Sequence, residues 1–169
     1  FGGNAISFNH AKYQIIKASK ETNQDSIDLG YVGKVDKIKT RDLKKTIEKG
    51  FIPVIAPIGI SRQHKYLNIN ADVVAGEVAE ALDAEKLILL TDVKGIGDSK
   101  NKLISKISLQ QGQRILKEEY IQGGMTPKLK AALRAKKRGV KTCHIIDGRV
   151  PHAVLLEVLT EEGVGTMIS

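Results

Sequence analysis

A six-residue segment in the second half of the chain combines residue types that suit an anion-binding helix start. Residues 123–128 read Gly-Gly-Met-Thr-Pro-Lys. Threonine is a good N-cap and proline suits the first helical position, so we expect Thr126 to begin a helix whose backbone N–H groups face an anion. Lys128 then lies in the first turn, where an ammonium group can neutralise charge on a transferring phosphoryl group. The alternative is an ordinary capped surface helix with a solvated lysine.

A second polar segment, residues 68–72, leads into a predicted helix. Asn68 offers an amide to a substrate carboxylate or amide. Asp72 offers a carboxylate that positions lysine ammonium groups without taking their protons. The alternative for Asp72 is a simple favourable interaction with the positive end of the helix dipole.

A third polar segment, residues 91–97, follows the apolar run 87–90. In open α/β sheets, ligands bind beyond the carboxyl ends of the strands, so a nucleotide's base and ribose are candidate ligands here. Gly95 and Gly97 allow a close approach of the backbone to such a ligand. The alternative is a plain turn.

The sequence lacks the signatures of several other chemistries. It contains no GxxxxGK[ST] P-loop, no GxGxxG after a strand and no GxSxG elbow. The four histidines, His10, His64, His144 and His152, have no metal-ligand spacing with cysteine or acidic residues, so we predict no metal site. The single cysteine, Cys143, lies in an apolar run and is interpreted as a core residue.

The composition is typical of a folded protein with one core or two small lobes: 169 residues, 41% of them hydrophobic. The net charge of +8 is compatible with nucleotide phosphates or nucleic acid. Dispersed basic residues and an aromatic content of only 4% make nucleic acid the less favoured partner.

No apolar run approaches the roughly 20 residues of a membrane span, and no leader opens the chain, so we expect a cytoplasmic protein with no membrane partner. A first residue of Phe1 indicates a processed chain or a fragment.

Strands and helices are expected to alternate through most of the chain. Short strands and turns are predicted up to about residue 39, including extended segments at 13–16 and 31–35. Buried strands are predicted at 51–57, 87–90 and 142–146, and helices at 40–50, 71–82, 109–118, 126–137 and 151–159. This alternation predicts an α/β fold in which a mainly parallel sheet lies between helices as a three-layer sandwich.

Four ordered segments resemble the N-acetylglutamate kinases, a family within the amino acid kinase superfamily: residues 68–72, 87–96, 123–128 and 144–152. Residues 28–33 and 51–59 also resemble that family. The resemblance runs from about residue 27 to the end, and it implies the fold of the amino acid kinases and carbamate kinases. It further implies a homo-oligomer that uses ATP with Mg²⁺ to phosphorylate the side-chain carboxylate of N-acetyl-L-glutamate in arginine biosynthesis.

The resemblance also implies roles for individual residues. Lys128 matches the lysine that stabilises the transition state, Asp72 the aspartate that organises the catalytic lysines, and Asn68 a substrate contact. The residues that match nucleotide-binding segments are Thr91, Asp92, Val93, Lys94, Gly95, Ile96, Gly97, Tyr120, Gly123, Gly124 and Met125. Residues 1–90 correspond to the C-terminal part of the amino-acid-substrate lobe, and residues 91–169 to the nucleotide-binding lobe.

The C-terminal tail resembles that of arginine-inhibited members of the family. This resemblance implies that L-arginine binds near His152, Glu157 and Gly165 as a feedback inhibitor. The alternative is that the tail only packs a final helix and strand.

Parts of the family pattern cannot be placed in this sequence: a second catalytic lysine, a glycine-rich phosphate loop and an arginine that grips the substrate's α-carboxylate. We therefore expect an N-terminally truncated family member with little or no turnover on its own. Residues 1–26 also differ from the family. Two other hypotheses stay open: a kinase for aminoadipate, aspartate, glutamate or UMP, and a non-catalytic module that binds nucleotide, arginine or nucleic acid.

Overall fold

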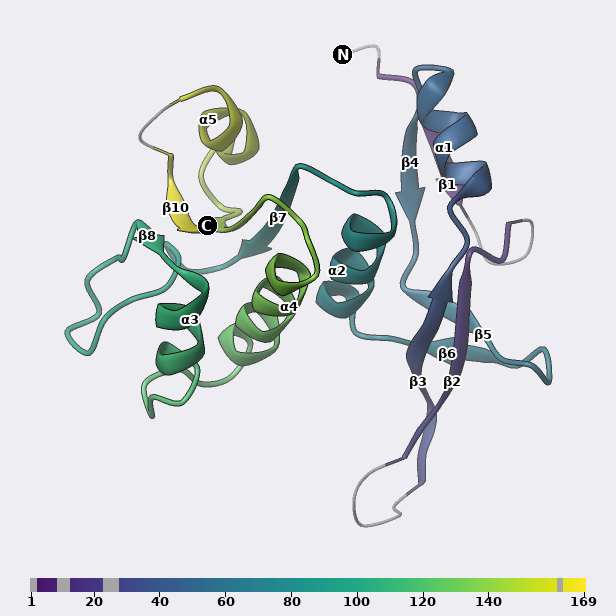
Figure 1. The fold of residues 1–169 in the computed structure, drawn as a ribbon, viewed down its shortest axis with the longest axis horizontal. Coiled ribbons are helices and arrows are strands. Elements are labelled where there is room, and N and C mark those ends of the chain that lie inside the picture. Colours follow the sequence, from purple (N-terminus) through teal and green to yellow (C-terminus); the bar gives the residue numbers. More distant parts are fainter. Residues whose placement is uncertain (1–2, 9–12, 23–27, 161–162) are drawn as a thin grey trace. The chain divides into compact units, whose positions relative to one another are not determined.

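The chain forms two compact units, Phe1–Leu82 and Asp83–Ser169 (Figure 1). The computed structural model describes residues 3–8, 13–22, 28–160 and 163–169. Within that described part, no helix combines the length and apolar character needed to cross a bilayer. The assignment of substrate and nucleotide lobes to residues 1–90 and 91–169 stays a prediction.

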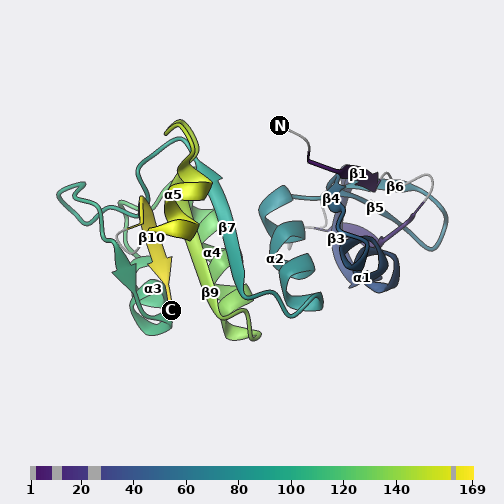
Figure 2. The same ribbon diagram turned by 90° about the horizontal axis from the view of Figure 1, so that it is seen from above.

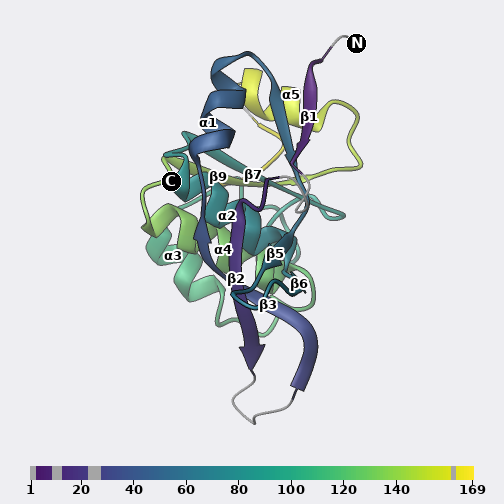
Figure 3. The same cartoon turned by 90° about the vertical axis from the view of Figure 1, so that its right-hand side faces the viewer.

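In its described residues, the first unit contains six strands in two groups. Strand β1 (Ala5–Phe8) pairs in parallel with β4 (Ile52–Ile55). Strands β2 (Ile16–Thr22) and β3 (Asp28–Ile38) form a long antiparallel pair, visible as a ribbon in Figure 3. Strands β5 (Ile58–Ile60) and β6 (Tyr66–Asn68) join this pair and close a small four-stranded barrel.

The described part of this unit also contains two helices, and each follows from its local sequence. Helix α1 (Arg41–Glu48) buries Leu43 completely and follows the expected cap position, Thr40, although the Thr40 side chain makes no capping hydrogen bond. Helix α2 (Ala71–Ala81) has Asn70 as its N-cap, and the Asn70 Oδ1 atom accepts the backbone N–H groups of Asp72 and Val73 at 3.0 and 3.1 Å. This cap satisfies two N–H groups that the first helical turn leaves without an intrahelical partner.

Two expectations for this unit need correction. Strand β4 is parallel as expected, but it is not buried, because Ile52 and Val54 are 60% and 55% exposed on a sheet of only two described strands. The predicted extended segment at 13–16 becomes a strand only from Ile16 onward. Gln14 has a φ of 45°, and this left-handed conformation interrupts an extended backbone.

The second unit is built on a four-stranded sheet with the order β7-β9-β10-β8 (Figure 2). Strand β7 (Lys86–Thr91) pairs in parallel with β9 (Thr142–Asp147), and β10 (Gly165–Ile168) pairs in parallel with β8 (Lys106–Ile107). The pairing of β9 with β10 is antiparallel. The sheet is therefore mixed with mainly parallel pairs, as the apolar runs predicted.

Helices cover both faces of this sheet. Helix α4 (Met125–Lys137) contacts β7 and β9 and packs against α3 (Leu109–Ile115), whereas α5 (Ala153–Leu159) contacts β9. Successive side chains of a strand point to opposite faces. Cys143 faces Lys136 of α4, and the next residue, His144, bonds Glu157 of α5. The predicted arrangement of a sheet between helices is thus confirmed in this unit, with α5 on one side and α3 and α4 on the other (Figure 1).

The start of α4 differs from the prediction. The helix begins at Met125 with Gly124 as its N-cap, so the expectation that Thr126 caps the helix was wrong. The Thr126 hydroxyl instead donates to the carbonyl oxygen of Ile121 at 3.1 Å. Pro127 becomes the third helical residue, where its missing N–H breaks no intrahelical hydrogen bond. Lys128 remains in the first turn.

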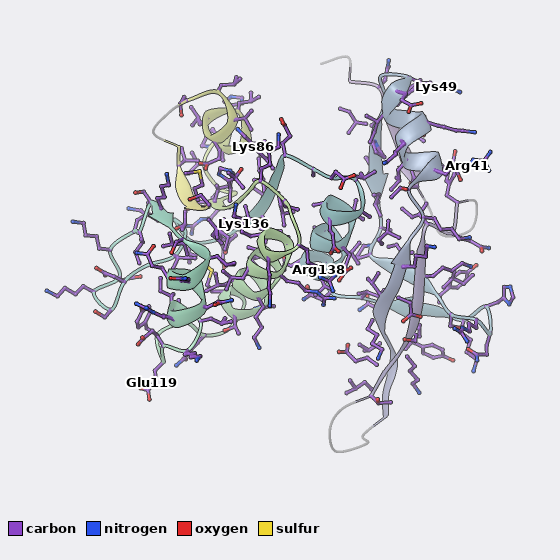
Figure 4. All side chains as sticks on the ribbon, viewed as in Figure 1. Arg41, Lys49, Lys86, Glu119, Lys136 and Arg138 are labelled. Carbon is purple, nitrogen blue, oxygen red and sulfur yellow. The ribbon has the colours of Figure 1, made fainter. Side chains whose placement is uncertain are left out.

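The carboxyl end of α4 is strongly basic. Figure 4 shows Lys136 and Arg138 at this end, and Arg134 and Lys137 lie in the same last turn. Positive side chains there interact favourably with the negative end of the helix dipole. The Lys136 ammonium also donates to the carbonyl oxygen of Lys141 at 2.7 Å, which ties the helix end to the entrance of β9.

Candidate functional site

Two adjoining pockets lie in the second unit, where the carboxyl end of β7 meets the amino end of α4. The loop pocket, of about 570 Å³, is lined mainly by residues 93–103 and 120–122. The helix pocket, of about 590 Å³, is lined mainly by residues 90–93, Lys128 and residues 148–149. Both pockets share Val93, Gln122, Met125 and Arg149, so they form one continuous groove. This location beyond a strand end is the one expected for ligands of α/β sheets.

The helix pocket brings Lys128 together with the polar residues that follow β7. Its lining includes Thr91, Asp92 and Gly124 as well as Lys128. The Thr91 hydroxyl donates to the Asp92 carboxylate at 3.3 Å. Thr91 and Lys128, more than thirty positions apart in the sequence, therefore line one cavity. The positively charged side chain in this cavity belongs to Lys128, in the first turn of α4. Such a site favours the binding of an anionic group.

The loop pocket is bounded by a loop, residues 97–103, that is stabilised by hydrogen bonds within itself. The Asp98 carboxylate accepts the backbone N–H groups of Lys100 and Lys102 at 2.8 and 2.9 Å, and Gly97 bridges to Leu103. Across the pocket, Tyr120 and Ile121 add apolar surface to the lining. The result is a mixed wall of apolar side chains and loop backbone, which is typical of sites for small organic ligands.

A buried threonine holds the start of this loop against β10. The Thr166 hydroxyl accepts the backbone N–H of Ile96 at 2.8 Å and donates to the carbonyl oxygen of Ile104 at 2.7 Å. Gly95 has a φ of 143°, and a Cβ atom there would lie 2.8 Å from the Thr166 Oγ1 atom, so no larger residue fits. Ile96 is fully buried and lines neither pocket, so its side chain serves the core.

An arginine held by a carboxylate lies at the junction of the two pockets. The Asp147 carboxylate receives three hydrogen bonds from Arg149: one from its backbone N–H at 3.0 Å, one from Nε at 2.9 Å and one from an Nη atom at 2.8 Å. These hydrogen bonds, chiefly the side-chain ones, lower the pKa of Asp147 from 3.8 to about 2. The Asp147 carboxylate in turn raises the pKa of Arg149.

The roles of Asp147 and Arg149 were not recognised from the sequence. Both follow the apolar run 142–146 directly, which is the same signal that indicated residues 91–97 after the run 87–90. Applied to β9, the rule for strand ends would have found them. Asp98, Ser99 and Asn101 also line the loop pocket and were not predicted.

Comparison with known proteins decides the family of this chain. The model of the amino acid kinase family matches residues 2–147. The chain belongs to the amino acid kinase family. It is 48% identical to the acetylglutamate kinase of Methanothrix thermoacetophila over 175 residues, which is 99% of this chain and 61% of that protein. The chain therefore spans about 60% of the length of the curated relatives that it matches.

Solved structures agree with this amino acid kinase assignment. The N-acetylglutamate synthase from Neisseria gonorrhoeae, complexed with coenzyme A and L-arginine, has a TM-score of 0.88 at 27% identity. That comparison covers 99% of this chain and 38% of the synthase. Carbamate kinase from Giardia lamblia bound to AMP-PNP has a TM-score of 0.68 at 18% identity over 98% of this chain and 61% of its own, which is a likeness of fold. The predicted α/β fold of the family is thus confirmed.

Within this amino acid kinase fold, two predicted site residues belong to the first unit. Asn68 is the last residue of β6, and Asp72 lies in the first turn of α2. Lys128 and the predicted nucleotide-binding segments belong to the second unit. That Asp72 and Lys128 act on one phosphoryl group therefore stays a prediction. Gly123 has a φ of 58°, forms the turn before α4 and lines neither pocket.

The three residues predicted to bind arginine lie in the C-terminal segment. Glu157 is buried, and its carboxylate bonds the Nδ1 atom of His144 and the backbone N–H of Val164, each at 2.6 Å. Gly165 packs so closely on β9 that an added Cβ would lie 2.3 Å from the carbonyl oxygen of Ile145. His152 is the N-cap of α5 and has a φ of 59°. The contacts of Glu157 and Gly165 supply a structural role for these two residues, and arginine binding stays a prediction for all three.

Proposed function

We propose that this chain is part of an acetylglutamate kinase that transfers the γ-phosphoryl group of ATP to the side-chain carboxylate of N-acetyl-L-glutamate. The products are ADP and an acyl phosphate, a step of arginine biosynthesis. Relatives named acetylglutamate kinase, 43% to 48% identical over 99% of this chain, support the reaction. The structural observation that carries the proposal is Lys128 in one groove with the polar residues after β7.

The groove has room for a nucleotide along its length. Each pocket falls within the range of about 300–1,000 Å³ that is typical of small-molecule sites. The apolar surface of Tyr120 and Ile121 in the loop pocket suits a base, whereas Lys128 in the helix pocket suits phosphate oxygens. We therefore orient the nucleotide with its base in the loop pocket and its γ-phosphate at Lys128.

In the proposed reaction, a carboxylate oxygen of N-acetyl-L-glutamate attacks the γ-phosphorus, and the bond from that phosphorus to the leaving oxygen of ADP breaks. Lys128 neutralises the negative charge on the transferred group, which is where phosphoryl-transfer enzymes gain most of their rate. Asp72 orients the catalytic lysines, and Asn68 holds the acceptor. Mg²⁺ bound with ATP would neutralise its phosphate oxygens, and such an ion would need few protein ligands of its own.

The test removes the Lys128 ammonium from the full protein. In Lys128→Ala we expect kcat to fall by about a hundredfold or more, with a change of only a few-fold in ATP affinity, because the charge acts in the transition state. Release of ADP should require both ATP and N-acetyl-L-glutamate. Lys130→Ala, which changes an exposed lysine two residues further along α4, is the matched control and should retain the parent rate. An unchanged rate in Lys128→Ala would reject the assigned role.

The choice of acceptor needs a separate measurement. Glutamate, aspartate, aminoadipate and UMP are the acceptors of the alternative kinases, and each should give much slower ADP release than N-acetyl-L-glutamate. Faster turnover with any of them would replace the proposed substrate. Binding of ATP without transfer to any acceptor would favour the non-catalytic module.

Feedback inhibition by L-arginine, a homo-oligomeric state and a cytoplasmic location complete the proposal. The similar gonococcal synthase was crystallised with L-arginine, which supports a test of this ligand. Titration of L-arginine against the initial rate should give progressive inhibition, and a flat response would reject an arginine site at His152, Glu157 and Gly165.

A further inference from the structure

Arg149 combines an exposed guanidinium with a firmly held position. Its side chain is 66% exposed, whereas the Asp147 carboxylate that binds it is 7% exposed. Arginine side chains on a surface normally lose considerable conformational freedom when they bind a ligand. Here, the hydrogen bonds to Asp147 already fix the plane of the guanidinium before any ligand arrives.

The position of Arg149 coincides with the junction of the groove. The other three residues that line both pockets, Val93, Gln122 and Met125, are uncharged. Arg149 thus places a positive charge between the apolar surface of the loop pocket and Lys128 in the helix pocket. Asp92, at the end of β7, also interacts electrostatically with this guanidinium.

The guanidinium retains donors for a ligand. An arginine side chain carries five N–H donors. Asp147 accepts from Nε and from one Nη atom of Arg149, so at least two further N–H groups are directed away from that carboxylate. A planar set of donors at a fixed orientation matches phosphate oxygens better than a lysine ammonium does.

We propose that Arg149 binds the polyphosphate of the nucleotide, at the oxygens between the base and the transferred phosphorus. Asp147 is then a positioning residue that holds the guanidinium toward the groove. This inference rests on the proposed function, since it takes the nucleotide to run from the loop pocket to Lys128. Arg149 is a binding residue in this scheme, and Lys128 keeps the separate task of stabilising the transition state.

The experiment measures ATP, ADP and adenosine binding by calorimetry in the full protein and its variants. Loss of one charge-assisted phosphate contact should weaken ATP and ADP binding about tenfold in Arg149→Gln. Arg149→Lys keeps the positive charge but loses the planar pair of N–H donors of the guanidinium. This variant should therefore also bind both nucleotides more weakly than the parent. Adenosine should bind all variants alike, because it carries no phosphate. Arg114→Gln, an exposed arginine of α3 outside the groove, is the matched control and should bind ATP like the parent.

A double-mutant cycle tests the positioning role of Asp147. Asp147→Asn should weaken ATP binding, and Asp147→Asn combined with Arg149→Gln should be no weaker than Arg149→Gln alone, because the carboxylate acts through the arginine. A merely structural role of Asp147 would instead give additive losses and would lower adenosine affinity as well. Unfolding midpoints of all variants show whether each protein remains folded at the temperature of the measurement.

The outcomes separate this inference from the proposed function. A parent protein that does not bind ATP overturns the proposed function and the role of Arg149 with it. A parent that binds ATP, with unchanged ATP affinity in both Arg149 variants, overturns the role of Arg149 alone. Equal losses for ATP and adenosine also overturn it, since they would place the guanidinium at the base or ribose.

Discussion

Strand β9 contributes one residue to each of two acidic–basic pairs that differ in their surroundings. Asp147 and Arg149 lie at its carboxyl end, with the arginine side chain 66% exposed. His144 and Glu157 lie between β9 and α5, and both side chains are only 5% exposed. The first pair presents a cation to a groove, whereas the second has no exposed face to present. An acidic side chain paired with a basic one therefore serves the proposed ligand binding at Arg149 and serves packing at His144.

The buried pair is satisfied on every side that the structure describes. His144 bonds Glu157 through Nδ1 and the Thr142 hydroxyl through Nε2, and Glu157 also accepts the backbone N–H of Val164. This network joins β9, α5 and the segment that leads into β10. Fully satisfied polar networks of this kind fix one arrangement of the core, and loss of one member leaves the others unpaired.

The largest effect in this comparison of the two pairs is expected from Glu157→Ala. It leaves His144 and the Val164 N–H without their buried acceptor, so we expect a loss of about 3 kcal/mol in the free energy of unfolding. Urea unfolding measures this loss. ATP affinity of the folded variant should stay at the parent value, because the pair lies outside both pockets. Glu118→Ala removes an exposed carboxylate as a control and should unfold like the parent. Reduced ATP affinity in folded Glu157→Ala would show that the two regions are not independent.

A smaller effect on both regions is expected from Thr166→Val, because Thr166 links β10 to the groove loop. The substitution leaves the Ile96 N–H without its acceptor and should cost about 2 kcal/mol of unfolding free energy. ATP binding should weaken a few-fold as the loop at residues 95–104 loses its support. Urea unfolding and calorimetry measure the two effects, with the exposed Thr160→Val as the control. Unchanged ATP binding would show that the loop holds its shape without Thr166.

The smallest effect is a pH dependence of stability at the Asp147–Arg149 pair. The pKa of Asp147 is lowered to about 2 in the folded chain, so the pair stabilises the fold above the ordinary pKa of 3.8 and loses this contribution as the pH falls toward 2. The difference in stability between the parent and Asp147→Asn should therefore be largest above about pH 4 and shrink below it. Urea unfolding of both proteins between about pH 2 and pH 6 tests this sign. A constant difference across this range would contradict the lowered pKa.

Prediction from the sequence succeeded where local patterns determine the outcome. The apolar runs gave β7 and β9 because buried parallel strands need continuous apolar sequence. The turn at Gly123 and the lysine in the first turn of α4 were also found. The cap at Thr126 was wrong because its hydroxyl bonds Ile121, and sequence spacing does not show that choice of partner.

The amino-acid sequence by itself determined the fold class, the family resemblance and the position of Lys128 at a helix start, because periodicity, turns and motif spacing are local properties. Only the tertiary structure decided which distant residues share the groove. Arg149 enters it because β9 lies beside β7 and ends at the same edge of the sheet. Glu157 is buried in the core because α5 packs against β9 at His144. Both outcomes depend on burial and strand order, which are set by contacts between segments far apart along the chain.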